Sequence, residues 1–212
     1  MRPARYSLAM AKQSRSGPVM RTVLDAVAER LMSGDESLIR IPEVCEATGI
    51  NYGSVYHHFG SREGVIDAAY EMIFAQLVEE DIALFRQGVE QATTFEEFVS
   101  IMQPVVASVS LGVARRHRRA MRVRIVAAAS TRPRLRMLIG QTQSRLSNEV
   151  RHTIELAQSR GWLREDLSAG ALAVLFQIVV FGRSLDDVSV DPVDEGEWEK
   201  TMSAVFFELL PR

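Results

Sequence analysis

Apolar residues recur at three- and four-residue spacing along most of this chain, which is the period of α-helices that bury one face. The first such stripe includes Met20, Val23 and Val27 and predicts a helix from about residue 18 to residue 32. Further stripes predict helices over about residues 62–87, 114–129, 131–160, 169–183 and 198–210, and one that follows Thr94. Glycine and proline are sparse, at 13 and 7 of 212 residues. The pattern therefore predicts an all-α protein.

A shorter stretch, residues 41–59, predicts two helices joined by a tight turn. Pro42 suits the first turn of a helix, because its missing N–H is not needed there. Gly49 can end that helix, because glycine accepts a positive φ, and Asn51 can cap a second helix. Val55 and Phe59 would hold the second helix to the body. The side chains that then project are hydrogen-bonding and aromatic groups: Tyr52, Ser54, Tyr56, His57 and His58.

Two short helices with a glycine turn have two interpretations. One is a helix-turn-helix, whose second helix enters the major groove of DNA and reads donors and acceptors on the base edges. The other is an ordinary helical hairpin inside a bundle. The spacing alone leaves these two interpretations level.

The longer run from Ile41 to Asp67 resembles the N-terminal signature of the tetracycline-repressor (TetR) family of transcriptional regulators. The matching positions are Val44-Cys45, Thr48-Gly49-Ile50-Asn51, Gly53, Val55-Tyr56, His58-Phe59, Ser61-Arg62-Glu63 and Ile66. The chain departs from the family pattern where Cys45 replaces alanine, Val55 replaces leucine and Arg62 replaces lysine. Each departure keeps the size class or the charge. The resemblance is specific over roughly residues 20–70 and rests on helix count and order beyond them.

The resemblance implies a domain organisation. We expect an all-α fold of about nine helices, with an N-terminal three-helix helix-turn-helix domain, a C-terminal helical bundle and a dimeric assembly. The expected segments are a flexible basic arm over residues 1–17, the DNA-binding domain over residues 18–62, and a ligand-binding and dimerisation domain over residues 63–212. The helix that follows residue 62 would transmit the ligand signal, as it does in the family.

The expected contacts with DNA lie on the second short helix and just after it. Asn51 would partly cap the helix, Gly53 would let the helix approach the DNA backbone closely, and Arg62 would bind a phosphate. The full predicted set is Asn51, Tyr52, Gly53, Ser54, Tyr56, His57 and Arg62.

Residues 169–183 leave almost no polar face. A helix that is apolar all round must be covered on all sides, and a second copy of the chain is the simplest cover. The run from Ala171 to Val180 is too short to cross a bilayer and contains Gln177. In the resembled family the last two helices form the dimer interface. The residues predicted for this interface are Ala169, Ala173, Phe176, Val180, Phe181, Met202 and Phe206.

The body is expected to hold a mostly apolar cavity for a small effector, since such cavities are the usual ligand sites. The candidates to line it are Phe74, Met102, Met121, Ile125, Met137 and Phe176. For each of these taken singly, plain core packing is the commoner role.

Charge is distributed unevenly, although the net charge is only −2. Residues 1–62 hold eight basic and six acidic residues, and the remainder holds 17 basic and 21 acidic residues. A basic end on an acidic body suits a protein that offers one end to DNA. The arginine run at residues 115–119 is either a second anion-binding patch or a helix face paired with acids on neighbouring helices, and we favour the paired face.

No catalytic or metal site is predicted. No two of the four histidines have the i, i+4 spacing that places two ligands on one helix face, and no phosphate loop or nucleophile motif is present. The single cysteine excludes an internal disulfide and fits a reducing compartment. We therefore expect a cytoplasmic protein that is not an enzyme and has no cofactor and no membrane partner.

Together these features predict a ligand-responsive transcriptional regulator. It would bind a palindromic DNA operator as a homodimer, act as a repressor, and be released by a small apolar or amphipathic effector. The alternatives are an all-α small-molecule carrier or enzyme without sequence-specific DNA binding, and a protein–protein adaptor with a vestigial helix-turn-helix.

Overall fold

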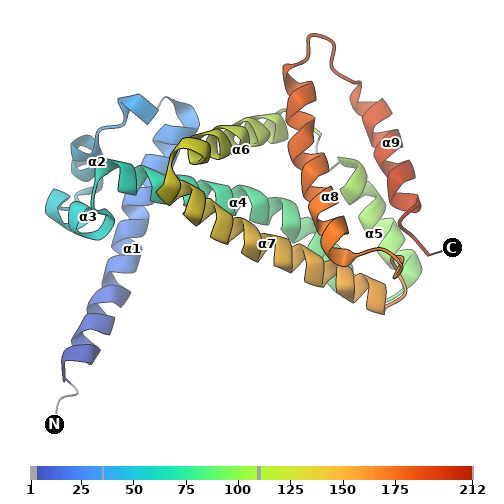
Figure 1. The fold of residues 1–212 in the computed structure, drawn as a ribbon, viewed down its shortest axis with the longest axis horizontal. Helices are drawn as coiled ribbons and strands as arrows, with labels where there is room; N and C mark the ends of the chain where they lie inside the picture. The colour runs from blue at the N-terminus through green and yellow to red at the C-terminus, as the bar shows by residue number, and fades with distance from the viewer. Residues whose placement is uncertain (1–3, 35, 109–110, 212) are drawn as a thin grey trace. The chain divides into compact units, whose positions relative to one another are not determined.

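The computed structural model describes residues 4–34, 36–108 and 111–211 of the chain (Figure 1). Over these ranges it contains nine α-helices, two short 3-10 segments and no strand. The elements are α1 (Ala4–Ser33), η1 (Glu36–Leu38), α2 (Ile41–Thr48), α3 (Tyr52–Phe59), α4 (Arg62–Gln91), α5 (Phe95–Ser108), α6 (Val113–Thr131), α7 (Pro133–Ser159), α8 (Ala169–Gly182), η2 (Arg183–Val188) and α9 (Glu195–Phe207). The all-α prediction is confirmed.

The chain divides into two compact units, Met1–Ile73 (unit 1) and Phe74–Arg212 (unit 2). The division falls inside α4, whereas the sequence placed the domain boundary before this helix. Val65, Ile66 and Ala69, in the first half of α4, are completely buried. These side chains belong to the core of unit 1, which explains why that unit extends beyond residue 62.

Helix α1 is longer than the sequence predicted. Val23, Val27 and Leu31 are fully buried along its second half, as the apolar stripe indicates. The helix begins at Ala4, so residues 4–17 are helical where a flexible arm was expected. Residues 1–3 of that expected arm lie outside the described residues.

Unit 2 packs α7 against α6 and α8, and α5 against α9, and α4 approaches α5 closely at one point. A Cβ atom on Gly88 of α4 would lie 2.5 Å from the Met102 Sδ atom of α5, so a larger residue at this position would require the Met102 side chain to move. Phe98 of α5 lies 5.2 Å from Trp162 and 6.1 Å from Phe206 of α9, measured between ring centroids. These aromatic contacts fix one side of the bundle.

The last helix starts earlier than the sequence predicted. The spacing of apolar residues placed it at about residues 198–210, after an acidic loop, whereas α9 runs from Glu195 to Phe207. The Asp194 carboxylate accepts hydrogen bonds from the backbone N–H groups of Gly196 at 2.9 Å and Glu197 at 3.1 Å. An aspartate N-cap therefore starts the helix one turn before its first apolar residue.

Candidate functional site

Helices α2 and α3 form the predicted helix-turn-helix. Gly49 ends α2 with φ 70° and ψ 14°, in the left-handed region where glycine carries no steric penalty. Asn51 then caps α3, since its side-chain oxygen accepts a hydrogen bond from the Ser54 N–H at 3.3 Å. Gly60 ends α3 with φ 85°. Gly49 and Asn51 therefore have the structural roles that were predicted for them.

Two side chains anchor α3 within unit 1. Val55 is completely buried and Phe59 is 6% exposed, and both lie on the side of α3 that faces the core. On α2, Val44 and Cys45 are also buried, and burial raises the pKa of the Cys45 thiol. The thiol therefore stays protonated and packs as a small hydrophobic group.

The opposite side of α3 faces solvent. Tyr52 is 45% exposed, and Ser54 and His57 are also exposed. Tyr56 is half-buried. His58 is exposed as well, although its ring packs edge-on against Phe59 at a centroid distance of 4.6 Å. The outward orientation expected for the DNA-reading side chains is present, and their contact with DNA remains a prediction.

Tyr52 and Tyr56 form a pair one helical turn apart. Their ring centroids are 4.3 Å apart, as expected for side chains at i and i+4. The pKa of Tyr56 is raised to about 12, and the largest cause is a hydrogen bond with Tyr52. Burial is the second cause. The Tyr56 phenol is therefore protonated at physiological pH and keeps a hydroxyl that can donate.

Arg62 has a structural role that the sequence did not indicate. Its Nε donates to the Ile39 carbonyl at 3.1 Å and its Nη2 donates to the Glu36 carbonyl at 2.6 Å. The Tyr70 hydroxyl donates to the Glu36 carboxylate at 3.1 Å. The predicted phosphate ligand is thus the residue that ties the η1 segment to α4, and its side chain is only 28% exposed.

Gly53 also has a local reason to be glycine. A Cβ atom there would lie 3.0 Å from the Asn51 Oδ1 atom, which is the atom that caps α3. The missing side chain leaves room for the cap. Close approach to DNA, for which Gly53 was selected from the sequence, remains a prediction.

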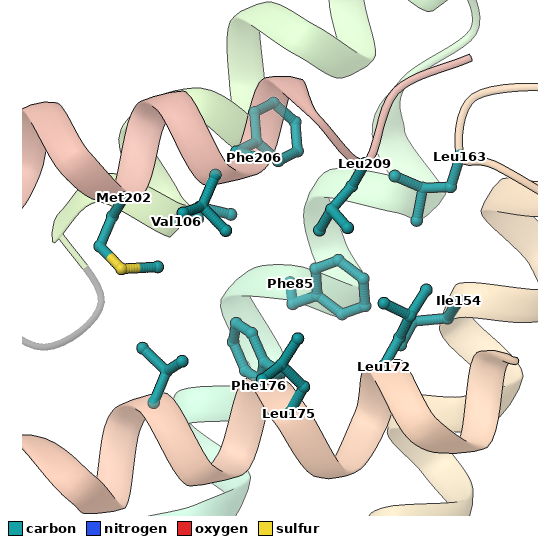
Figure 2. Close-up of a pocket in the computed structure, with 12 residues that line it drawn as sticks. Phe85, Val106, Ile154, Leu163, Leu172, Leu175, Phe176, Met202, Phe206 and Leu209 are labelled. Atoms are coloured by element: carbon teal, nitrogen blue, oxygen red, sulfur yellow. The ribbon is translucent and has the colours of Figure 1, made fainter. Parts of the chain in front are cut away.

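Unit 2 contains an apolar pocket between α8 and α9, which we call the apolar pocket (Figure 2). Its volume is about 320 Å³. Side chains from α4, α5 and α7 complete its wall, and all of the lining residues are aliphatic, aromatic or methionine: Phe85, Val106, Ile154, Leu163, Leu172, Leu175, Phe176, Val179, Met202, Val205, Phe206 and Leu209. Figure 2 shows the α8 and α9 side chains pointing toward one another across this space.

Only one of the six predicted lining residues, Phe176, lies in the apolar pocket. Met102 and Ile125 are completely buried and Met121 is 2% exposed, so these three fill the core. Met137 is 57% exposed on α7. The remaining candidate, Phe74, lines a different cavity. Apolar periodicity identifies the buried face of a helix, but it does not show where packing leaves a gap.

That second cavity lies between α4, α6, α7 and α8 and has a volume of about 380 Å³. We call it the Arg122 cavity. It mixes apolar residues with an arginine, two glutamines and a serine: Phe74, Arg122, Val126, Ile139, Gln143, Ser147, Val174, Gln177, Ile178, Phe181 and Gly182. None of its polar members was among the residues predicted to line a ligand cavity.

Four of the residues predicted for a dimer interface are largely buried within a single chain. Ala173, Val180, Met202 and Phe206 are between 1% and 8% exposed, and their contact with a second subunit remains a prediction. Ala169, Phe176 and Phe181 are half-buried. The prediction chose positions by size and apolar character, whereas helical geometry turns a different side of α8 outward. That side, which we call the α8 ridge, consists of Ala171, Val174, Leu175 and Ile178.

The arginine run on α6 is paired with acids, which was the favoured interpretation. Asp81 of α4 forms ion pairs with Arg115 at 3.8 Å, Arg118 at 3.2 Å and Arg122 at 3.0 Å. Arg119 makes two hydrogen bonds of 2.6 Å with the Asp187 carboxylate. The run is less solvated than expected, because Arg119 and Arg122 are 4% and 5% exposed.

Residues Ala169–Val188 are long and apolar enough, by length and composition, to cross a membrane. The last part of this window is η2, which is charged. Arg183 pairs with Asp186 at 3.2 Å and stacks on Trp198 at 4.5 Å, and Asp187 pairs with Arg119. The charged end of the window is therefore packed inside unit 2. Across the described ranges, no group of three or more His, Cys, Asp or Glu residues is placed to hold a metal ion.

Comparison with known proteins gives a family match in the N-terminal part of the chain and a relative that spans nearly all of it. Residues 37–69 match the family described as "Bacterial regulatory proteins, tetR family". The HTH-type transcriptional regulator UidR of Escherichia coli (strain K12) is 24% identical over 198 residues, which are 93% of this chain and 96% of that protein. The match to the family begins within η1, ends in the first turns of α4, and so includes the whole helix-turn-helix.

Two solved structures have a similar fold. Salmonella enterica GusR aligns with a TM-score of 0.62 and 19% identity, covering 91% of this chain and 95% of that one. A putative transcriptional regulator from Saccharomonospora viridis in complex with choline aligns with a TM-score of 0.63 and 13% identity, covering 91% and 98%. The resemblance to the tetracycline-repressor family is confirmed, and the matches support a DNA-binding transcriptional regulator.

Proposed function

From this tetR-family helix-turn-helix and fold, we propose that the protein is a homodimeric transcriptional repressor of the cytoplasm that binds a palindromic operator and is released by a small effector. The observation that carries the proposal is the exposed face of α3, with Tyr52, Ser54 and His57 projecting from a helix anchored by Val55 and Phe59. One such face per subunit would enter successive major grooves, about 34–36 Å apart. Hydroxyl and imidazole groups can read base edges without a formal charge.

Dimerisation is supported by the α8 ridge. Val174, Leu175 and Ile178 are 51%, 46% and 58% exposed on one side of α8. Contiguous exposed aliphatic side chains of this kind mark interaction sites on soluble proteins. A twofold arrangement would bring the ridge of one subunit against the same region of the other, as symmetric dimers require.

Effector binding is supported by the apolar pocket. It is lined without a charged or polar side chain, and its volume of about 320 Å³ is at the lower end of the range for ligand sites. Phe85 of α4 is part of its wall, and α4 is one continuous helix from Arg62 to Gln91. An apolar effector that displaces Phe85 would therefore act on the helix that also belongs to unit 1.

The experiment is to select bound sequences from a random DNA pool and to measure the affinity of the selected operator in gel-shift or anisotropy titrations. Tyr52→Ala should weaken operator binding by about fivefold or more, since a good base contact contributes about 1–3 kcal/mol. Val19→Ala is the matched control, because Val19 is 43% exposed on α1 and Tyr52 is 45% exposed on α3. The control should bind as the wild type does.

Two outcomes separate the proposal from its competitors. If the protein enriches no sequence from the pool and binds DNA without preference, the proposal of a regulator is overturned. The alternative of an all-α carrier or enzyme would then be favoured. Equal loss of affinity in both variants would show that α3 is not the reading helix. We expect the protein to sediment as a dimer and to enrich a palindromic sequence. Binding to that sequence should be weakened in Tyr52→Ala and not in Val19→Ala.

A further inference from the structure

The Arg122 cavity lies on the other side of α8 from the apolar pocket. The α8 residues that line the Arg122 cavity are Val174, Gln177, Ile178, Phe181 and Gly182, and those that line the apolar pocket are Leu172, Leu175, Phe176 and Val179. At about 100° per residue these two sets face nearly opposite directions. The two cavities are therefore separate sites, and Figure 2 shows only the apolar one.

A buried guanidinium with an unused donor lines the Arg122 cavity. Arg122 is 5% exposed, and its Nη1 donates to Asp81 at 3.0 Å. Its Nε–H is buried and has no hydrogen-bond partner in the described structure. The guanidinium carbon lies 5.8 Å from the centroid of the Phe181 ring, which lines the same cavity. A buried donor that lacks an acceptor is costly, so an acceptor brought by a ligand would recover that free energy.

Three arginines gather around one carboxylate beside this donor. Asp81 forms ion pairs with Arg115, Arg118 and Arg122, and Glu80 adds one further contact with Arg118 at 2.8 Å. Burial is the largest cause of both pKa shifts here, raising that of Asp81 and lowering that of Arg122. Because Asp81 is shared in this way, a carboxylate on a ligand would give Arg122 a second acceptor.

The rest of the cavity suits an apolar body. Phe74, Val126, Ile139 and Ile178 supply aromatic and aliphatic surface. Gln143, Ser147 and Gln177 hydrogen-bond one another, with Gln143 Nε2 donating to Ser147 Oγ at 2.9 Å and Gln177 Nε2 donating to it at 3.2 Å. Because these polar groups are already hydrogen-bonded to one another, Arg122 is the group that would select a ligand.

We propose that the Arg122 cavity binds a small carboxylate with an aromatic or compact aliphatic body, whose carboxylate accepts a hydrogen bond from the Arg122 Nε–H. The volume of about 380 Å³ limits the body to roughly the size of a fused pair of rings. Binding at this site requires neither DNA nor the apolar pocket, and Val174 and Ile178 place the cavity beside the α8 ridge of the proposed dimer.

The test is isothermal titration calorimetry of the full chain with 2-naphthoate and with the neutral analogue 2-naphthalenemethanol. The wild type should bind the carboxylate about tenfold to a hundredfold more tightly than the alcohol, because a hydrogen bond between charged groups is stronger than one to a neutral group. In Arg122→Gln the two affinities should become equal. Circular dichroism would check that this variant is folded.

A second pair of variants identifies the site even if Arg122→Gln fails to fold. Val126 is 42% exposed and lines the Arg122 cavity, and Val205 is 43% exposed and lines the apolar pocket. Val126→Trp should fill the Arg122 cavity and abolish 2-naphthoate binding, whereas Val205→Trp should leave the binding unchanged. No binding to the wild type, no preference for the carboxylate, or a block by Val205→Trp alone would each overturn the proposal.

Discussion

Replacing Arg62 by alanine tests the difference between what the sequence and the structure assign to this side chain. The sequence predicts that Arg62 binds a phosphate, and on this interpretation its removal should weaken DNA binding alone. In the structure Arg62 connects α4 to η1, through hydrogen bonds of 3.1 Å and 2.6 Å to the Ile39 and Glu36 carbonyls. Its loss should therefore destabilise unit 1 before any DNA is present.

The expected magnitude follows from those two bonds. A hydrogen bond from a charged donor contributes about 1.5–3 kcal/mol, and the 28% exposure of the side chain reduces that value. We expect Arg62→Ala to lower the free energy of unfolding of unit 1 by about 2–3 kcal/mol in total. With a urea dependence of about 1–1.5 kcal/mol per molar for a unit of this size, the urea midpoint should fall by about 2 M.

The chain offers a way to follow each unit separately. All four tyrosines lie at positions 6–70 in unit 1, and both tryptophans lie at positions 162 and 198 in unit 2. Urea titrations of Arg62→Ala should shift the tyrosine transition and leave the tryptophan transition unchanged. Arg21→Ala is the control, since its ion pair with Asp25 is exposed and such pairs contribute little.

The reasoning fails if Arg62→Ala unfolds at the same urea concentration as the wild type. A conservative variant adds a second criterion. Arg62→Lys keeps the positive charge but lacks the planar set of donors that reaches two carbonyls at once. If it restores DNA affinity but not stability, Arg62 has both roles; if it restores both, the two carbonyl contacts are not what holds η1 to α4.

Three further outcomes are expected. Asn51→Ala should lower the stability of unit 1 by about 1 kcal/mol in the same tyrosine-detected titration, because it removes the cap of α3; an unchanged midpoint would mean that the cap is not needed. Arg119 holds the pKa of the Asp187 carboxyl below its usual range, so this pair contributes stability above the unfolded pKa of about 4 and loses it as the pH falls through the lower folded value. The wild type should therefore lose stability in acid more steeply than Asp187→Asn in pH-dependent tryptophan titrations, and parallel curves would contradict the assignment. Ile178→Asp should dissociate the dimer in sedimentation velocity while keeping the helix content, because it places a charge on the α8 ridge; a dimer that persists would move the interface elsewhere.

The helix-turn-helix could be predicted because its determinants are local. Gly49 and Asn51 act on the backbone within a few residues, and the apolar period of α3 fixes which side Val55 and Phe59 bury. Each of these signals lies inside the stretch that it shapes. The same holds for the position of most helices, whose ends follow from caps and breakers.

Interactions between distant parts of the chain could not be predicted in this way. Arg62 bonds to carbonyls 23 and 26 residues earlier, and Arg122 meets Asp81 across 41 residues. A backbone carbonyl is the same group at every position, so nothing in the sequence marks the two that Arg62 reaches. Arg62 therefore resembled a free cation, and Arg122 resembled one member of a charged run.

Helix α8 shows why a uniformly apolar sequence does not predict what packs against each side of the helix. Its composition predicted that every side would be covered, and a second subunit was the simplest cover. In the structure Ala173 and Val180 are buried within the chain. Other residues of α8 line the apolar pocket and the Arg122 cavity, and Val174, Leu175 and Ile178 are exposed on the α8 ridge. Because Val174 and Ile178 of the ridge also line the Arg122 cavity, and Leu175 also lines the apolar pocket, a ligand in either cavity would lie beside the proposed dimer surface. Effector binding and subunit contact are thereby placed on the same four turns of helix.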